Sequence, residues 1–246
     1  MDEAELIRQF EQQHKDIAIA YGGDGTLLSK VAEVWKKKSI IPVRNYARCS
    51  KHTHLLEEIC TGNVSSKELK AGLKWSKAPF LEARLKSFDN DIQPYRGIAE
   101  IVLKSYNPTE ALRFTVFVNG KAYMQQCIAD GIIFASKLGS HGYFKSVTRT
   151  LFTDNDSVGL GFIAPTYGIC NLVLKATDNI VVKLDRHAIV MISHDKEYET
   201  IELRADEEIE LSQSCEGASL FGYDVFCCQD CRNLRNSTIV NDKYIA

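Results

Sequence analysis

A glycine-rich turn between an apolar run and an amphipathic stretch constrains the fold of this chain more than any other feature. The apolar residues 17–20 are followed by Tyr-Gly-Gly-Asp-Gly-Thr at 21–26 and by a helix-like segment that reaches Trp35. This order predicts a buried strand, a tight turn and a helix, the corner at which α/β proteins hold phosphate. Gly22, Gly23 and Gly25 leave the backbone open to an anionic ligand, because no Cβ stands in the way.

Asp24, in the middle of this turn, indicates what the turn is for. A carboxylate beside a phosphate repels it unless the carboxylate holds a divalent cation or accepts a proton, so Asp24 favours phosphoryl transfer over phosphate storage. No Lys-Ser/Thr pair follows the turn, which excludes a Walker A loop. The alternative is an ordinary turn in which Asp24 caps the helix, and the sequence leaves both interpretations open.

The composition excludes several classes of protein. Over 246 residues, 45% are hydrophobic and 25% are charged, as in an ordinary globular protein with a sizeable core. A net charge of −2 gives no electrostatic reason to expect a nucleic-acid partner. The start of the chain is acidic, and no segment reaches the roughly 20 apolar residues of a membrane span. We therefore expect a cytoplasmic protein without a membrane partner.

The spacing of apolar residues changes near Pro79. Residues 17–44 read as strand, helix and strand, whereas short β-rich runs dominate after Pro79, with a hairpin turn at Asn119-Gly120. Two domains follow from this change. We expect an α/β phosphate-binding domain over 1–78, on which the tail 231–246 packs back, and an all-β, sandwich-like domain over 79–230.

The eight cysteines do not form the dense pattern of a disulfide scaffold, so reduced thiols are the default interpretation. Cys228 and Cys231 are the exception, because their spacing suits a metal. Cys49, His52 and His54 would be further ligands. A zinc site built from these two segments and a set of ordinary thiols both remain open, and we include no metal ligand in the predicted site.

A second informative segment spans residues 128–143. Asp130-Gly131 open an apolar strand, and the turn Gly139-Ser140-His141-Gly142-Tyr143 closes it. Together with the Gly-Gly-Asp-Gly-Thr turn, the strand at 97–103 that carries Glu100, and Asn45 after Pro-Val-Arg, this segment resembles the NAD kinase family. The order and approximate spacing of the four segments agree with that family, and the resemblance covers residues 16–226.

The resemblance implies both a fold and a reaction. The fold is an α/β domain followed by a β-sandwich-like domain. The reaction is transfer of a phosphoryl group from ATP or polyphosphate to the 2′-hydroxyl of the adenosine ribose of NAD, which gives NADP. The resemblance further implies Mg²⁺ or another divalent cation with ATP, and a homodimer or homotetramer.

The resemblance also implies roles for individual residues. Asp24 is the candidate catalytic residue, because its carboxylate would accept the proton of the 2′-hydroxyl or position the metal-bound donor. Glu100 and Asp130 would accept hydrogen bonds from ribose hydroxyls. Ser140, His141 and Tyr143 lie where the family contacts adenine and the other nucleotide half. The residues expected to bind nucleotide or phosphate are Gly22, Gly23, Gly25, Thr26, Asn45, Glu100, Asp130, Ser140, His141 and Tyr143.

The chain departs from the family at several positions. Ala99 replaces an asparagine, the turn after Asn45 lacks its glycines, and 21 residues before Gly22 leave no room for the family's first strand and helix. Arg48 and Lys51 are either ligands of the donor phosphates or solvated cations, and His141 is either a ligand or a structural residue. Two other functions stay open: a lipid or small-alcohol kinase with the same glycine turn, and a catalytically inactive NAD-binding regulator.

Overall fold

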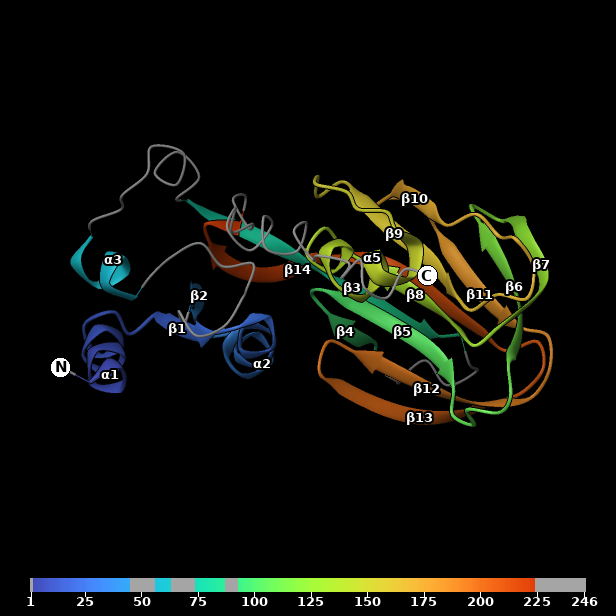
Figure 1. Cartoon of the computed structure of the whole chain (residues 1–246), viewed down its shortest axis with the longest axis horizontal. Coiled ribbons are helices and arrows are strands. Elements are labelled where there is room, and N and C mark those ends of the chain that lie inside the picture. Colours follow the sequence, from blue (N-terminus) through green and yellow to red (C-terminus); the bar gives the residue numbers. More distant parts are fainter. Residues whose placement is uncertain (1, 45–55, 63–73, 87–92, 224–246) are drawn as a thin grey trace, which may run out of the picture. The chain divides into compact units, whose positions relative to one another are not determined.

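The computed structural model describes residues 2–44, 56–62, 74–86 and 93–223, and these form two compact units (Figure 1). The first unit takes in the described residues up to Lys77 and those from Ala218 on, and the second is Ala78–Gly217. Strands β3 (Trp75–Leu85) and β14 (Glu208–Phe221) contribute to both units. The end of β14 therefore belongs to the first unit, although the sequence pattern assigns it to the β-rich domain. The predicted domain boundaries stay predictions, and the tail 231–246 lies outside the described residues.

The first unit is built on a parallel pair of strands. β1 (Ile17–Gly22) pairs with β2 (Ser39–Arg44), and the end of β14 joins the pair where Leu220 lies opposite Ile40. The strands form because their apolar residues are buried, with Ala20 and Val43 fully so. No helix among the described residues combines the length and the apolar character that crossing a membrane requires.

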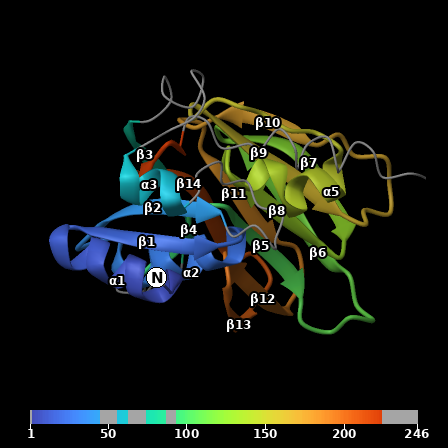
Figure 2. The same ribbon diagram turned by 60° about the vertical axis from the view of Figure 1, so that its left-hand side comes forward.

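Among the described residues of the first unit, helices pack against these strands (Figure 2). They are α1 (Glu3–Gln13), α2 (Asp24–Val34) and α3 (Leu56–Thr61). Leu56 of α3 and apolar side chains of α1 pack on Ile19, Ile41 and Val43. Helix α2 connects β1 to β2 and buries Leu27. The predicted strand, helix and strand are therefore present, and they place the glycine turn where β1 ends.

The second unit consists of two packed β-sheets. Besides parts of β3 and β14, its strands are β4 (Tyr95–Gly97), β5 (Glu100–Ser105), β6 (Leu112–Val118), β7 (Lys121–Ala129), β8 (Gly131–Ala135), β9 (Ser157–Ile163), β10 (Leu172–Lys175), β11 (Ile180–Leu184), β12 (Ala188–His194) and β13 (Glu197–Leu203). One sheet contains β3, β4, β6, β7, β11 and β14, and the other has the antiparallel order β10-β9-β8-β5-β12-β13. Apolar side chains of both sheets form one core, in which the rings of Phe114 and Phe162 stack.

The expected fold class, an α/β part and a β-sandwich-like part, is confirmed. The hairpin turn is also confirmed, with positive φ at both Asn119 and Gly120 between β6 and β7. Other details differ from the prediction. The apolar pattern predicts a helix from Leu27 and two separate strands, at 207–211 and 218–226. In the structure helix α2 begins at Asp24 and one strand, β14, spans Glu208–Phe221, while 224–226 lie outside the described residues. Strands β4 and β10 and helix α5 (Tyr143–Thr148) were not expected. The pattern also predicts a short helix over 66–74, which lies almost entirely outside the described residues.

Candidate active site

The glycine turn joins the end of β1 to the start of α2. Gly23 occupies the N-cap position, Asp24 is the first helical residue, and no side chain caps the helix. The alternative interpretation, in which Asp24 is the N-cap, is therefore wrong. The first amides of a helix lack acceptors within the helix and carry partial positive charge, so they favour an anion at this turn.

Gly22 and Gly23 serve the turn in different ways. The φ of Gly22 is +154°, and a Cβ there would lie 2.5 Å from Thr26 Oγ1 and 3.0 Å from Thr26 Cβ. A Cβ on Gly23 would meet nothing within 4 Å. Gly22 is therefore required by the fold of the turn itself, whereas Gly23 leaves open space beside the backbone. The Thr26 amide donates to the Gly23 carbonyl at 2.9 Å, which fixes the first turn of α2.

In the second unit, Ser136 organises the turn that follows β8. Its hydroxyl donates to the Ile98 carbonyl and accepts from the Leu138 amide at 3.1 Å, while its own amide donates to the Ala99 carbonyl at 2.9 Å. Gly139 completes this contact, because a Cβ there would overlap the Ala99 carbonyl oxygen. The turn is thus packed against the segment that leads to Glu100.

Ser140 lies at the centre of the same turn and is fully buried. Its hydroxyl lies 2.9 Å from the carbonyl oxygens of both Lys137 and Phe152. The side chain therefore holds the turn closed, and its predicted role in nucleotide binding stays a prediction. His141 is half-buried at the end of the 3-10 turn Gly139–His141.

Helix α5 anchors this turn on the outer face of the antiparallel sheet. Phe144 is fully buried and packs edge-on against Phe152, with ring centroids 6.0 Å apart. Gly159 and Gly161 of β9 make room for the helix, because a Cβ on either would come within 2.6 Å of the Phe144 ring or the Thr148 methyl group. Tyr143, the first residue of α5, is held in place by this packing.

The structure places the Tyr143 phenol within electrostatic range of two other predicted residues, Glu100 and Asp130. Burial raises the pKa of the Tyr143 phenol, and the carboxylates of Glu100 and Asp130 raise it further. Glu100 is the first residue of β5, Asp130 lies between β7 and β8, and Tyr143 is 37% exposed. The two carboxylates lie near opposite ends of the β5–β8 ladder, because Glu100 pairs with Ala135 whereas the Asp130 carbonyl accepts from the Ser105 amide. Each carboxylate supplies hydrogen-bond acceptors, and the Tyr143 ring supplies a stacking face.

Several other candidates lie outside the described residues. They are Asn45, Arg48, Cys49, Lys51, His52, His54, Cys228 and Cys231. Within the part of the chain that the structure describes, no three His, Cys, Asp or Glu side chains are grouped so that they could hold a metal ion. Asp195, which the motifs did not indicate, contacts the backbone of residues 98–100 in the second unit. A lone Asp between two short β-rich runs reads as an ordinary turn residue, so the sequence carried no signal for this contact.

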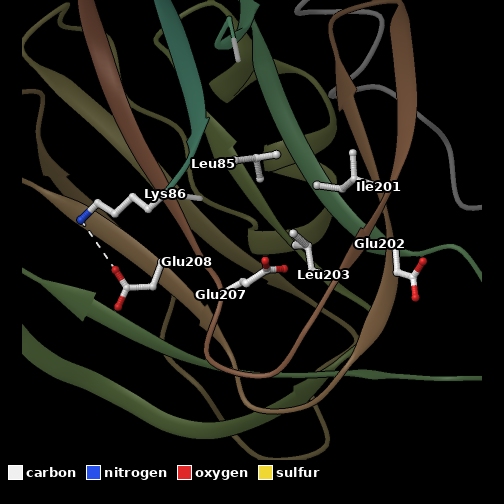
Figure 3. A pocket seen from close by; sticks show the side chains of 7 residues that line it. All are labelled: Leu85, Lys86, Ile201, Glu202, Leu203, Glu207 and Glu208. Atoms are coloured by element: carbon white, nitrogen blue, oxygen red, sulfur yellow. Dashed lines mark ion pairs between the residues drawn. The ribbon is translucent and has the colours of Figure 1, made fainter. Parts of the chain in front are cut away.

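A cavity of about 320 Å³ lies elsewhere in the second unit (Figure 3). The side chains of Leu85, Ile201 and Leu203 converge on it, and Lys86 forms an ion pair with Glu208 at its margin, at 3.7 Å. None of its lining residues belongs to the predicted motifs. The cavity is therefore not part of the candidate site.

Comparison with known proteins agrees with this geometry, although no family model matches the chain. The NAD kinase of Methanosarcina acetivorans is 24% identical over 215 residues, which cover 85% of this chain and 74% of the relative. The NAD kinase of Clostridium beijerinckii is 26% identical over 193 residues, 78% of this chain and 64% of the relative. The chain thus spans between about two thirds and three quarters of the length of these relatives.

Solved structures agree as well. An Archaeoglobus fulgidus NAD kinase in complex with ATP has a TM-score of 0.69 at 20% identity, over 94% of this chain and 91% of that protein. Yeast NADH kinase complexed with NADH has a TM-score of 0.68 at 19% identity, over 84% of this chain and 60% of that protein. The chain therefore has the two-part fold of this group of kinases. The curated relatives and the structural neighbours together support its assignment to the NAD kinase family.

Proposed function

We propose that the protein is an NAD kinase, a phosphotransferase that acts on an alcohol group and converts NAD to NADP. The observation that carries the proposal is the turn from β1 into α2, where Gly23 leaves open space beside the backbone and Asp24 is the first helical residue. NAD carries two riboses, and the carboxylates of Glu100 and Asp130 are strong acceptors for ribose hydroxyls. The names of the relatives and the nucleotides bound in the solved structures of NAD(H) kinases support the same conclusion.

In this proposal the glycine turn of the first unit binds the phosphoryl donor and activates the attacking hydroxyl. The backbone amides of Gly22, Gly23 and Gly25 and the Thr26 hydroxyl hold the donor phosphates, since the Thr26 amide donates to the Gly23 carbonyl. Asp24 accepts the proton of the 2′-hydroxyl while the 2′-oxygen bonds to phosphorus and the bond from phosphorus to the donor oxygen breaks.

The acceptor nucleotide is held by residues of the second unit. Glu100 and Asp130 orient the ribose hydroxyls, and the Tyr143 ring contacts the nucleotide. His141 and the backbone at Ser140 complete this contact. The side chain of Ser140 is committed to Lys137 and Phe152, and its amide donates to the Ser136 carbonyl at 2.7 Å, so its contribution to binding comes from its carbonyl oxygen.

Mg²⁺ or another divalent cation belongs to this proposal as a companion of ATP. Magnesium is usually bound by one or two carboxylates together with substrate phosphates and water. Asp24 supplies one such carboxylate, and the described residues contain no cluster that would hold an ion alone. The residues therefore fit an ion that arrives with ATP, where it would neutralise charge on the transferred group.

The location, oligomeric state and partners of the enzyme belong to the same proposal. We place it in the cytoplasm, as a homodimer or homotetramer, with no nucleic-acid or membrane partner and with polyphosphate as a possible donor beside ATP. Strands β10 and β13 end the antiparallel sheet, and each carries an exposed apolar residue, Val173 and Tyr198. Such edges are suited to pairing with another copy of the chain.

The test is NADP formation by the purified protein with NAD, Mg²⁺ and either ATP or polyphosphate, read with an NADP-specific dehydrogenase. We expect product from the natural chain and a loss of at least about 100-fold in Asp24→Asn, the scale of a lost general base. Asp16→Asn, an exposed carboxylate of the same unit, is the matched control and should keep full activity. No product with NAD still bound would indicate a regulator, and no NAD binding would indicate another alcohol, such as a lipid.

A further inference from the structure

The Asp195 carboxylate binds the backbone just before the strand that carries Glu100. Its Oδ2 accepts a hydrogen bond from the Ile98 amide at 2.8 Å, and its Oδ1 accepts from the amides of Ala99 at 2.9 Å and Glu100 at 3.4 Å. The Asp195 amide in turn donates to the Glu100 carbonyl at 3.1 Å. One residue of the β12–β13 turn therefore binds four backbone groups within three consecutive residues.

These contacts supply hydrogen-bond acceptors to backbone amides that lie before the first paired residue of β5. The ladder of β5 with β8 starts where Glu100 lies opposite Ala135, and its ladder with β12 ends where Ile101 lies opposite His194. The amides of Ile98 and Ala99 precede both ladders, and both residues are buried. A buried amide needs an acceptor, and Asp195 supplies it from a segment almost 100 residues away.

The surroundings of Asp195 fit this role. Its φ is +55°, a left-handed conformation that Asp and Asn adopt more readily than most residues. Gly97 leaves room for the carboxylate, because a Cβ there would lie 3.0 Å from Asp195 Oδ1. The neighbouring His194 is fixed by a hydrogen bond between its Nδ1 and the Arg96 carbonyl, at 3.0 Å. The turn and the segment 96–100 are thus joined along their length.

We propose that Asp195 is a positioning residue that holds the backbone of 98–100 so that the Glu100 carboxylate meets the acceptor ribose. The inference rests on the proposed function of Glu100. Asp195 itself does not touch the substrate. It acts through the main chain, since a rotation of the Glu100 peptide would move its carboxylate away from Tyr143.

The experiment compares Asp195→Asn and Asp195→Ala with the natural chain. Asparagine keeps the left-handed turn and one acceptor oxygen, whereas alanine removes all three amide contacts. Asp185→Asn is the matched control, because Asp185 is a carboxylate of the same unit that accepts a hydrogen bond from Thr115 Oγ1 at 2.9 Å and lies outside the site. We expect the KM for NAD to rise about tenfold or more in Asp195→Ala and less in Asp195→Asn, with kcat changed much less.

Two readouts do not depend on turnover. The amides of Ile98, Ala99 and Glu100 should exchange with solvent at least about tenfold faster in Asp195→Ala, and the pKa of Tyr143 should fall as Glu100 moves away. A variant that loses stability but keeps the KM and the Tyr143 titration would overturn the inference, as would unchanged exchange. If the natural chain forms no NADP, the proposed function fails and the substrate role of Asp195 fails with it. If the natural chain is active but its Asp195 variants bind NAD normally, only the inference about Asp195 fails.

Discussion

The backbone of Gly139 lies so close to Ala99 that a Cβ on the glycine would overlap the Ala99 carbonyl oxygen. The same carbonyl accepts a hydrogen bond from the Ser136 amide, and the Ala99 side chain is only 6% exposed. Ala99 therefore contributes its main chain to the turn. The contact joins the segment before Glu100 to the turn before Tyr143.

Gly139→Ala should therefore destabilise the second unit. Because the neighbouring atom belongs to the backbone, it cannot rotate away, and the overpacking should lower the free energy of unfolding by about 1–3 kcal/mol or more. Urea denaturation would measure the change. Gly168→Ala is the control, since a Cβ there would meet nothing within 4 Å, and equal stability of the two variants would contradict the geometry.

Gly22→Ala should destabilise the first unit through its contact with Thr26. The new Cβ meets the Thr26 side chain and also imposes strain at a positive φ, so we expect a loss of about 1–3 kcal/mol in the free energy of unfolding. Adding Thr26→Ala should recover the steric part but not the strain. Gly23→Ala, with open space at its Cβ, should unfold at nearly the same urea concentration as the natural chain, and a loss as large as that of Gly22→Ala would argue against this account.

The pKa of Tyr143 should respond to the charge of Glu100. Burial raises this pKa above the ordinary value of 10.0, and the Glu100 carboxylate raises it further, because a second negative charge nearby disfavours the phenolate. Glu100→Gln removes that charge, so the pKa should fall toward its ordinary value. Ring-carbon NMR of labelled tyrosine, with Tyr143→Phe to identify the signal, would follow the titration. An unshifted titration in Glu100→Gln would show that the two groups are not near each other.

Cys127 should resist alkylation in the folded protein. The side chain is 1% exposed, and burial raises the pKa of its thiol from 9.0 to about 11. The nucleophilic thiolate is therefore scarce at pH 8, whereas the exposed Cys170 should react readily. Mass spectrometry of peptides after a short treatment with iodoacetamide would separate the two, and comparable labelling would contradict the burial of Cys127.

The same thiol affects stability at high pH. Its pKa is higher in the folded chain than in the unfolded chain, so its contribution is fully present below about pH 9 and is lost as the pH rises toward 11. Cys127→Ser should flatten that part of the stability profile. Denaturant titrations between pH 8 and 11 would measure the difference between the two chains.

Parts of the site were predictable because they depend on consecutive residues. The run 17–20, the glycine turn and the hairpin at Asn119-Gly120 each require particular backbone conformations or burial over a few positions, and the structure contains all three. Helix α5 was missed because its six residues are too few to show a helical period, and it is held by the packing of Phe144 on β8 and β9.

The sequence by itself determined the local elements, the kinase resemblance and the identity of Asp24, Glu100, Asp130 and Tyr143 as candidates. Only the tertiary structure decided which distant groups meet. It placed Asp195 on the amides of 98–100, Gly139 against Ala99, and the Ser140 hydroxyl on Phe152. The physical reason is that strand pairing and core packing bring together residues far apart along the chain, and no pattern of neighbouring residues encodes those contacts.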